Sequence, residues 1–448
     1  MKQALSLIAL TSVLFTHAVR AELPIQHRPE HDAASQKWIA SHLAGLLETY
    51  KQLHAHPELS LHEQETAALV AYELRAAGYE VTEHVGGFGV VGILKNGPGP
   101  TLMIRGDMDA LPITEDTGLP YASKVQTKSD EGEMVGVMHA CGHDVHTTNL
   151  LGTAKLLIAE RASWSGTLMI VAQPAEEVGR GALMMMEDGL FKRFPRPDYA
   201  LALHVEPTVI AGKVALVSGW AAANVDSVDI TLYGRGGHGA QPHHTSDPIV
   251  AGSYLVTELQ TIVSRRINPQ SPAVVTVGSF HGGTKHSIIP DEVHLQLTVR
   301  SYTDEVRHEL LESITQLTQD ICKAHRCTKP PAIQIKKDYT PAVYNDPQLT
   351  SAAEGIITAV LGEDNAIEVR PTMGGEDFGR YARTLKIPGL LLRLGATAPK
   401  LFKASKRKGD HPLPGLHSSQ FAPDAALTLG TGIRVMGNLA LAILGKTM

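Results

Sequence analysis

The chain has 448 residues, of which 43% are hydrophobic and 19% are charged, as in ordinary soluble globular proteins. This length exceeds one core of usual size, so two domains are expected. The net charge of -6, without long lysine or arginine runs, argues against a nucleic-acid-binding surface. One short basic cluster, KASKRK (403–408), is interpreted as a solvated loop.

The N-terminal segment has the pattern of a secretory signal peptide. One lysine precedes an apolar run from Ala4 to Phe15, and Val19 and Ala21 provide the small residues before a cleavage position. The apolar run is too short for a membrane-spanning helix, although an uncleaved anchor is the alternative, and no later stretch reads as apolar enough to cross a bilayer. We expect residues 1–21 to be removed and the mature protein to be exported, periplasmic or secreted, without stable membrane association.

Short apolar segments in the first half predict strands that are buried on both faces, as in a parallel sheet covered by helices. They are TLMIR (101–105), GTLMIVAQ (166–173) and YALALHV (199–205), preceded by an amphipathic helix over 62–78. Ionisable residues stand at or just beyond the ends of these strands: Asp107, Asp109, Glu176, Glu177 and His204. Because sites in open α/β sheets gather at the carboxyl ends of strands, we expect these groups at one sheet edge.

The pattern changes after about residue 220. Hydrophobic and polar residues alternate in VDITLYG (228–234) and VHLQLTVR (293–300), which predicts a sheet with one solvated face. Helices are predicted over 247–265 and from Thr303 to Ile321, and further strands over 273–280 and 332–337. This order is a split βαβ pattern. We therefore predict an α+β (βαββαβ, ferredoxin-like) domain at 220–338, inserted in a mainly parallel α/β domain made of 22–219 and 339–448 that closes with a helix from about Asp424.

The densest cluster of reactive side chains is MHACGHDVH (138–146). Cys141 and His143 flank Gly142, and a tight turn there could direct a thiolate and an imidazole at one metal ion. Cys141 could instead be a nucleophile, with His139 or His143 as its base, or a structural thiol. The motif alone leaves these alternatives open.

Other segments supply partners for such a metal, each with a plainer interpretation. The adjacent Glu176 and Glu177 of QPAEE point different ways, so one could bind metal while the other stays free as a base; alternatively they begin a helix. His204, at the end of an apolar strand, could be a core histidine. His417, in PGLHSSQF, could be a surface histidine.

Two more motifs could support the site. Asp107 and Asp109 in RGDMDALP could orient ligand imidazoles, or they could cap a neighbouring helix. In GRGGHGAQPHH (234–244) the glycines let the backbone approach a ligand while His238 projects from a turn; a flexible surface loop is the alternative.

The three cysteines bear on the compartment. In an exported protein, Cys322 and Cys327 of ICKAHRC could form a disulfide, with Cys141 shielded by a metal. Two buried free thiols are the competing interpretation.

Taken together, these motifs resemble metallopeptidase family 20, in its amidohydrolase branch of hippurate hydrolases, plant auxin-conjugate hydrolases and N-acetyldiaminopimelate deacetylases. The matching stretches are LHAHPELSLHEQET (53–66), RGDMDALP, MHACGHD, QPAEE, HVEP, GGHGAQPH, GGTKHSIIPDEV (282–293), GGEDF (374–378) and LHSSQF. The resemblance implies a two-metal site with the ligands Cys141, His143, Glu177, His204 and His417. It also implies Glu176 as general base, His238 as a stabiliser of the oxyanion, and an inserted lid that often forms a homodimer.

Two positions depart from the family pattern, and both are candidate substrate-binding residues. Ser287 stands where an asparagine is usual before the apolar pair and proline, so a side-chain amide is replaced by a hydroxyl. Gly375 in GGEDF stands where serine is common. The reaction is therefore more transferable from the family than the identity of the substrate.

The expected function is hydrolysis of the amide bond of an N-acyl amino acid or small peptide-like conjugate by a metal-activated water, with Glu176 as the base. Thiolate, imidazole and carboxylate ligands suit two divalent ions such as Zn, Mn, Ni or Co. A metallo-carboxypeptidase or dipeptidase is the alternative on the same site. A cysteine hydrolase and a non-catalytic metal- or ligand-binding protein are the alternatives from other classes.

Overall fold

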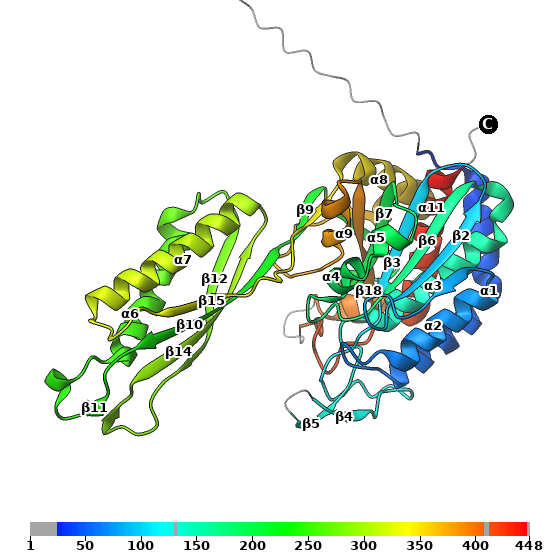
Figure 1. Cartoon of the computed structure of the whole chain (residues 1–448). Helices are drawn as coiled ribbons and strands as arrows, with labels where there is room; N and C mark the ends of the chain where they lie inside the picture. Colours follow the sequence, from blue (N-terminus) through cyan, green and yellow to red (C-terminus); the bar gives the residue numbers. More distant parts are fainter. Residues whose placement is uncertain (1–24, 130–131, 407–411, 446–448) are drawn as a thin grey trace, which may run out of the picture.

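The computed structural model describes residues 25–129, 132–406 and 412–445. The predicted signal peptide and part of the KASKRK segment lie outside these residues. The described chain forms a large α/β domain and a smaller α+β domain, which project from a common junction (Figure 1). This agrees with the predicted fold class.

The large domain is built on an eight-stranded sheet. In spatial order its strands are β1 (Glu80–Thr82), β2 (Val90–Asn96), β6 (Gly166–Gln173), β3 (Thr101–Asp107), β7 (Tyr199–Ile210), β18 (Gly389–Thr397), β8 (Val214–Leu216) and β17 (Ala366–Glu368). The central strands β6, β3, β7 and β18 are mutually parallel, whereas β2 and β8 run antiparallel to their central neighbours. A separate hairpin is formed by β4 (Gln126–Lys128) and β5 (Met134–Gly136).

Helices cover both faces of this sheet. One face packs against α2 (Gln64–Ala76), α3 (His143–Ala159), α8 (Pro347–Leu361) and α11 (Ala425–Leu444), with α1 (Pro29–Ala55) outside α3 and α11. The other face packs against α4 (Gly181–Glu187), α5 (Leu190–Arg193) and α9 (Gly379–Leu385). The short α10 (Pro399–Ala404) follows β18. Successive side chains of a strand point to opposite faces of the sheet. Because helices cover both faces, side chains on both faces must be apolar, which explains the continuous apolar runs of the sequence.

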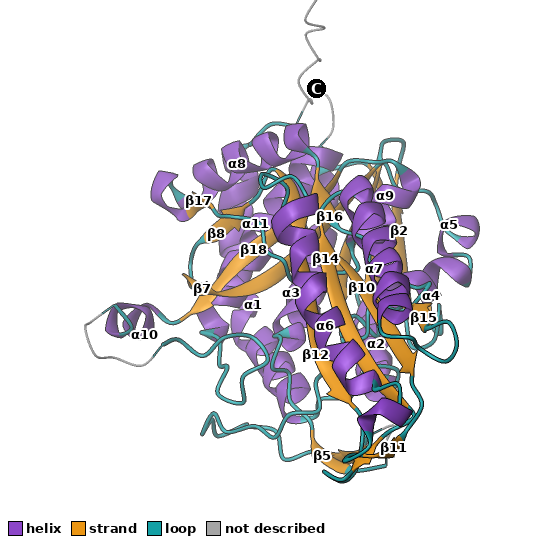
Figure 2. Cartoon of the chain, turned by 90° about the vertical axis from the view of Figure 1, so that its left-hand side faces the viewer, coloured by secondary structure: helices purple, strands orange, loops and turns teal. Residues whose placement is uncertain are grey.

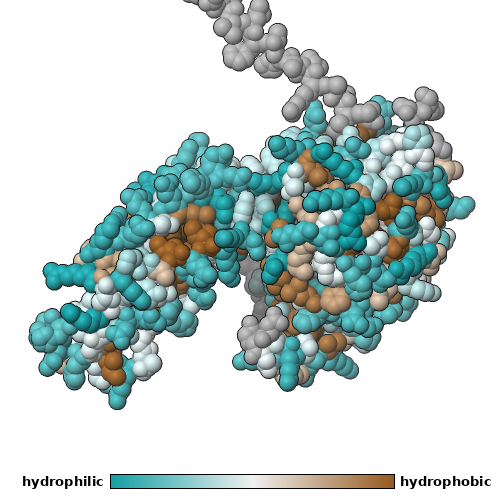
Figure 3. Space-filling view, viewed as in Figure 1, coloured by the Kyte–Doolittle hydropathy of each residue, from teal (hydrophilic) through white to brown (hydrophobic). Residues whose placement is uncertain are grey.

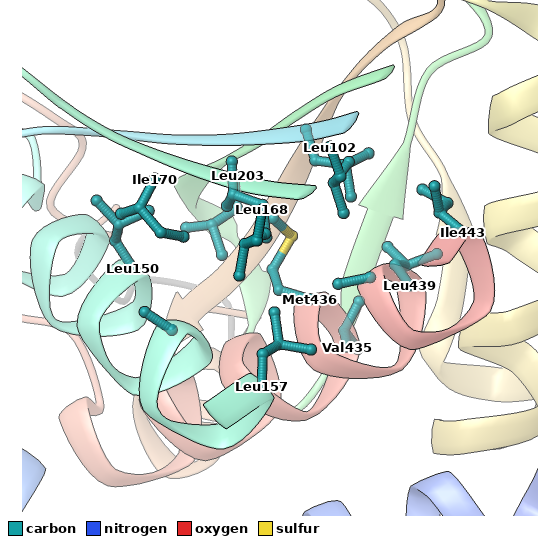
Figure 4. Close-up of a cluster of buried hydrophobic side chains, with 14 of the residues drawn as sticks. Leu102, Leu150, Leu157, Leu168, Ile170, Leu203, Val435, Met436, Leu439 and Ile443 are labelled. Atoms are coloured by element: carbon teal, nitrogen blue, oxygen red, sulfur yellow. The ribbon is translucent and has the colours of Figure 1, made fainter. Parts of the chain in front are cut away.

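The helix α11 corrects one expectation about the sequence. No segment after the N-terminal one was expected to be apolar enough to cross a membrane, but the length and composition of α11 would allow it to do so. Most of α11 is buried inside the domain, where Val435, Met436 and Leu439 pack against the sheet and α3 (Figure 4). It is the central helix of the core.

The smaller domain is a four-stranded antiparallel sheet in the order β12 (Ala273–His281), β14 (Glu292–Ser301), β10 (Asn224–Tyr233) and β15 (Ala332–Ile335). Two helices, α6 (Pro248–Thr261) and α7 (Asp304–Ala324), cover one face of this sheet (Figure 2). A short ribbon of β11 (Gly237–His238) and β13 (Ile288–Ile289) lies at its far end. The chain order β10–α6–β12–β14–α7–β15 reproduces the predicted βαββαβ pattern. Cys322 and Cys327 are joined as a disulfide in this domain.

The two domains are joined by adjacent segments. Beside the junction, β9 (Gly219–Ala222) pairs antiparallel with β16 (Val343–Asn345). On the small-domain side, Val225 and Thr340 exchange backbone hydrogen bonds of 2.8 and 3.1 Å. Away from this junction the domains are separated by open space in the view of Figure 3.

Candidate metal centre and active site

The carboxyl ends of β3, β6 and β7 meet at one edge of the large sheet. β3 ends at Asp107, and Asp109 follows two residues later. Glu176 and Glu177 follow β6 in the same way, whereas His204 belongs to β7 itself, at the end of its fully buried part. The parallel strands thus bring residues from three segments to a common edge.

The loop before α3 brings the thiol to this edge. Gly142 has φ of 77°, the left-handed region that favours glycine, and a Cβ there would lie 2.5 Å from Cγ2 of Val205. This turn lets Cys141 and His143, the first residue of α3, face the same space. Sγ of Cys141 lies 3.5 Å from Nε2 of His204.

Glu177 connects the remaining groups. Its Oε1 lies 3.8 Å from Nε2 of His143, and its Oε2 lies 3.4 Å from Nε2 of His417. His417 comes from the C-terminal segment, and its backbone N–H donates to the carbonyl oxygen of Ala140. The structure therefore brings together all five predicted metal ligands. We call them the ligand cluster: Cys141, His143, Glu177, His204 and His417.

The ligand cluster fits divalent metal ions. Nε2 of His143 and Oε1 of Glu177 are buried without a hydrogen-bond partner among the described residues, and such atoms are costly unless a cation binds them. Burial raises the pKa of the Cys141 thiol well above its ordinary value, and the Glu177 carboxylate raises it further. A thiolate here therefore requires an adjacent cation, which disfavours a metal-free cysteine nucleophile.

The two aspartates of RGDMDALP contact different histidines. Oδ1 of Asp109 lies 3.3 Å from Nδ1 of His143, and its Oδ2 accepts a hydrogen bond from the backbone N–H of Glu177. Oδ1 of Asp107 is 2.6 Å from Nδ1 of His146, whose Nε2 accepts a backbone N–H of β7. No role was predicted for His146, although it stands in the motif; here it links β3 to β7 beneath the ligand cluster.

Glu176 lies beside a second group of acids. Carboxylate oxygens of Glu176, Glu376 and Asp377 approach within 4.8 Å of one another. Burial raises the pKa of Glu176 well above its ordinary value, and the nearby Glu376 carboxylate adds to this. Arg105 is fully buried and ion-pairs with Asp107 at 2.6 Å and with Glu376 and Asp377 at 3.0 Å. Sequence reasoning missed this arginine, although a charge inside an apolar strand was a visible signal.

An open cavity of about 410 Å³ adjoins the ligand cluster. Glu176 and the ligand cluster, except the buried His143, line its floor. Val225 and Arg300 of the small domain and Arg393 of β18 also line it. The cavity therefore combines candidate metal ligands, three carboxylates outside the ligand cluster (Glu176, Glu206 and Glu376) and two guanidinium groups.

The other predicted residues lie in different places. His238 is exposed on β11, at the end of the small domain far from the ligand cluster (Figure 1), and it does not line the cavity. Ser287 lies beside it, because its carbonyl oxygen accepts a hydrogen bond from the N–H of Gly239. Gly375 lines the cavity, where a Cβ would lie 2.6 Å from Cγ2 of Val225. The side chain of Val225 thus occupies the space that a larger residue at 375 would need.

Comparisons with known proteins match this arrangement. The model of peptidase family M20/M25/M40 matches residues 103–405. The chain is 41% identical to hippurate hydrolase of Campylobacter jejuni, over 75% of this chain and 84% of that protein. It is 35% identical to thermostable carboxypeptidase 1 of Saccharolobus solfataricus, over 79% of this chain and 86% of that protein.

Among solved structures, the chain is similar to the YXEP protein of Bacillus subtilis, a dinuclear metal-binding peptidase of the M20 family. The two share 30% identity with a TM-score of 0.72, over 90% of this chain and 99% of that chain. The family match spans more than half of the sequence, and the matched region contains four of the five residues of the ligand cluster. The chain belongs to peptidase family M20/M25/M40.

Proposed function

We propose that the protein is a metal-dependent amidohydrolase that cleaves the amide bond of N-acyl amino acids or small peptide-like conjugates. The observation that carries the proposal is the convergence of five ligand side chains beside Glu176, a carboxylate outside the ligand cluster that adjoins His143 and Glu177. A purely metal-binding protein has no need of an unligated carboxylate at that position. We propose two divalent ions held by the ligand cluster, because cysteine, histidine and glutamate side chains suit borderline metals such as zinc.

The metal ions would supply Lewis-acid activation of water and of the substrate carbonyl. Glu176 takes the proton of the attacking water and returns it to the leaving amine. The raised pKa of Glu176 suits this exchange, since a base with a very low pKa holds the proton too weakly. Asp109 lies beside Nδ1 of His143 and would orient the ring, which leaves Nε2 available to hold a metal ion.

The proposed role of His238 depends on the position of the small domain, which carries this residue on β11. In one chain it lies at the far end of that domain, so it can reach the cavity only after domain closure or from a second copy. We propose that the small domain is a lid through which the protein forms a homodimer, with His238 stabilising the oxyanion of the tetrahedral intermediate.

The cavity volume suits a small conjugate. The similarity to hippurate hydrolase supports an N-acyl amino acid as the substrate of this protein. The similarity to a carboxypeptidase supports the alternative, a small peptide cleaved at the same site. We further propose that the protein is exported, which agrees with the N-terminal pattern and with the Cys322–Cys327 disulfide.

The test is metal analysis of the purified protein coupled to a screen of N-acetyl, N-benzoyl and dipeptide substrates, with and without chelator. We expect about two divalent ions per chain, hydrolysis of at least one acyl amino acid, and loss of activity with chelator that metal restores. Metal binding without hydrolysis of any such amide would overturn the proposed activity. Preferential release of C-terminal residues from peptides would favour the carboxypeptidase alternative.

A further inference from the structure

Arg393 has an unusual position for an arginine. It lies within β18 near the centre of the large sheet, paired in register with the ligand His204 on β7 and with Ala215 on β8. Only 8% of its surface is exposed, and the strand is otherwise almost wholly apolar. A guanidinium stays charged in a protein, so burying one requires a compensating anion.

No such anion is provided by the part of the chain that the structure describes, where the Arg393 guanidinium makes no hydrogen bond or ion pair. One candidate is Glu206, which lines both of the cavities that Arg393 lines. Its Oε1 instead accepts hydrogen bonds from the backbone N–H of Thr208 at 3.0 Å and from its hydroxyl at 2.7 Å. The positive charge of Arg393 is therefore directed at space that a bound molecule can fill.

That space has two connected parts. Arg393, Glu206 and Thr372 line both the main cavity beside the ligand cluster and an adjoining cavity of about 250 Å³. The adjoining cavity is also lined by the exposed Arg370. In the adjoining cavity two guanidinium groups thus face one carboxylate, Glu206, which leaves a net charge of one positive unit for a ligand there.

We propose that Arg393 binds a second carboxylate of the substrate, beyond the α-carboxylate that every N-acyl amino acid carries, and that this second carboxylate extends past His204 into the adjoining cavity. The inference rests on the proposed amidohydrolase activity and specifies its substrate class. A guanidinium matches a carboxylate through two parallel hydrogen bonds, and one net positive charge suits a monoanion better than a doubly charged phosphate. The carboxylate belongs either to the acyl group, as in a succinyl amide, or to an acidic side chain of the amino acid.

Two pairs of matched substrates distinguish these sources. N-succinyl-L-alanine is compared with N-butyryl-L-alanine, and N-acetyl-L-glutamate with N-acetyl-L-glutamine. We expect kcat/KM to favour the carboxylate-bearing member of one pair by about 10- to 100-fold, the size of a lost interaction with a buried charge. Arg393→Gln should abolish this ratio, and Arg393→Lys should keep part of it. Arg265→Gln is the matched control, since Arg265 is exposed on the small domain and, within the described part of the chain, its guanidinium donates only to the carbonyl oxygen of Ser264.

A binding measurement separates this inference from the proposed activity. Calorimetry on the metal-loaded full chain compares succinate with succinamate, which share one carboxylate and differ at the other end. We expect succinate to bind about 10-fold more tightly, and Arg393→Gln to remove the difference. Equal binding of succinate and succinamate would overturn the inference. Hydrolysis of both substrate pairs without a preference, or with preferences unchanged in Arg393→Gln, would also overturn it. Tighter Arg393-dependent binding of phosphate would overturn the carboxylate assignment. If nothing is hydrolysed but succinate is still preferred through Arg393, the proposed activity fails and the anion site stands.

Discussion

Nη1 of Arg105 donates a 2.6 Å hydrogen bond to Oδ2 of Asp107, and both side chains are completely buried. The same arginine compensates the carboxylates of Glu376 and Asp377 beside Glu176. One buried cation therefore holds the acidic side of the active site together, and its loss leaves carboxylates without a counter-charge.

We predict that Arg105→Gln lowers the free energy of unfolding of the large domain by about 3–5 kcal/mol, as expected for removal of one partner from a buried ion pair. Urea denaturation followed by circular dichroism measures this change. Arg75→Gln is the control, because Arg75 pairs with Glu83 at the surface and should cost less than about 1 kcal/mol. Equal losses in the two variants would contradict the role assigned to Arg105.

Glu176 and Glu177 allow a comparison between neighbours. We predict that Glu176→Gln retains its metal but loses nearly all turnover, because an amide cannot accept the proton of water. Glu177→Gln should lose metal content, since Glu177 contacts both His143 and His417. Metal analysis and kcat for the two variants decide the assignment. Full activity in Glu176→Gln, or full metal content in Glu177→Gln, would show that the roles are misassigned.

Cys141 should bind metal and be a poor nucleophile without it. We predict that iodoacetamide labels Cys141 slowly both in the metal-loaded protein and after chelation, because burial raises the pKa of the free thiol, and that Cys141→Ser binds less metal. Mass spectrometry of the labelled peptide and metal analysis check both statements. A cysteine nucleophile would behave differently, since alkylation would abolish activity while chelators would leave it unchanged.

His54 should make stability depend on pH. It is buried between Asp144 and Glu115, at 2.7 and 3.0 Å, and although burial opposes its charge, these carboxylates raise its pKa from 6.5 to about 10. Because the pKa of His54 is higher in the folded state than in the unfolded state, protonation of His54 stabilises the folded protein. This stabilisation is complete at pH values below the unfolded-state pKa of 6.5 and is lost as the pH rises toward 10.

We therefore predict that the difference in Tm between the wild type and His54→Gln is largest near pH 6 and shrinks as the pH approaches 10. Thermal unfolding across this range measures it. His56→Gln provides the control, because His56 is exposed and its ring hydrogen-bonds to the carbonyl oxygen of Gln52 and not to a carboxylate among the described residues. A difference that grows with pH would mean that His54 is buried in its neutral form.

The buried strands β3, β6 and β7 were predictable because each lies in the parallel part of a sheet covered on both faces and has an apolar run. The buried strands β2 and β18 were not predicted. The inserted βαββαβ unit was predictable from its alternating strands and the clear stripe of α7. The helix α1 was missed, because its 27 residues mix polar and apolar side chains with little periodicity. Its burial depends on packing against α3 and α11, which local sequence does not reveal.

The candidate site was predictable where it follows strand ends and family motifs. All five residues of the ligand cluster meet as expected. The burial of Arg105 and Arg393 beside the site was not predicted. Whether an arginine is buried depends on the residues that surround it in the fold, and these lie far away in the sequence. The partners of Arg105 in GGEDF lie 271 and 272 positions away in the sequence. The distant position of His238 in one chain also depends on how the two domains are arranged, which no local pattern encodes.

The paired strands β9 and β16 have a consequence for catalytic turnover. Every residue of the ligand cluster belongs to the large domain, whereas Val225 and Arg300 reach the cavity from beyond this double-stranded connection. A rotation of the small domain about that connection would change the width of the cavity entrance without moving the ligand cluster. Under the proposed activity, product release would then not require loss of the metal ions.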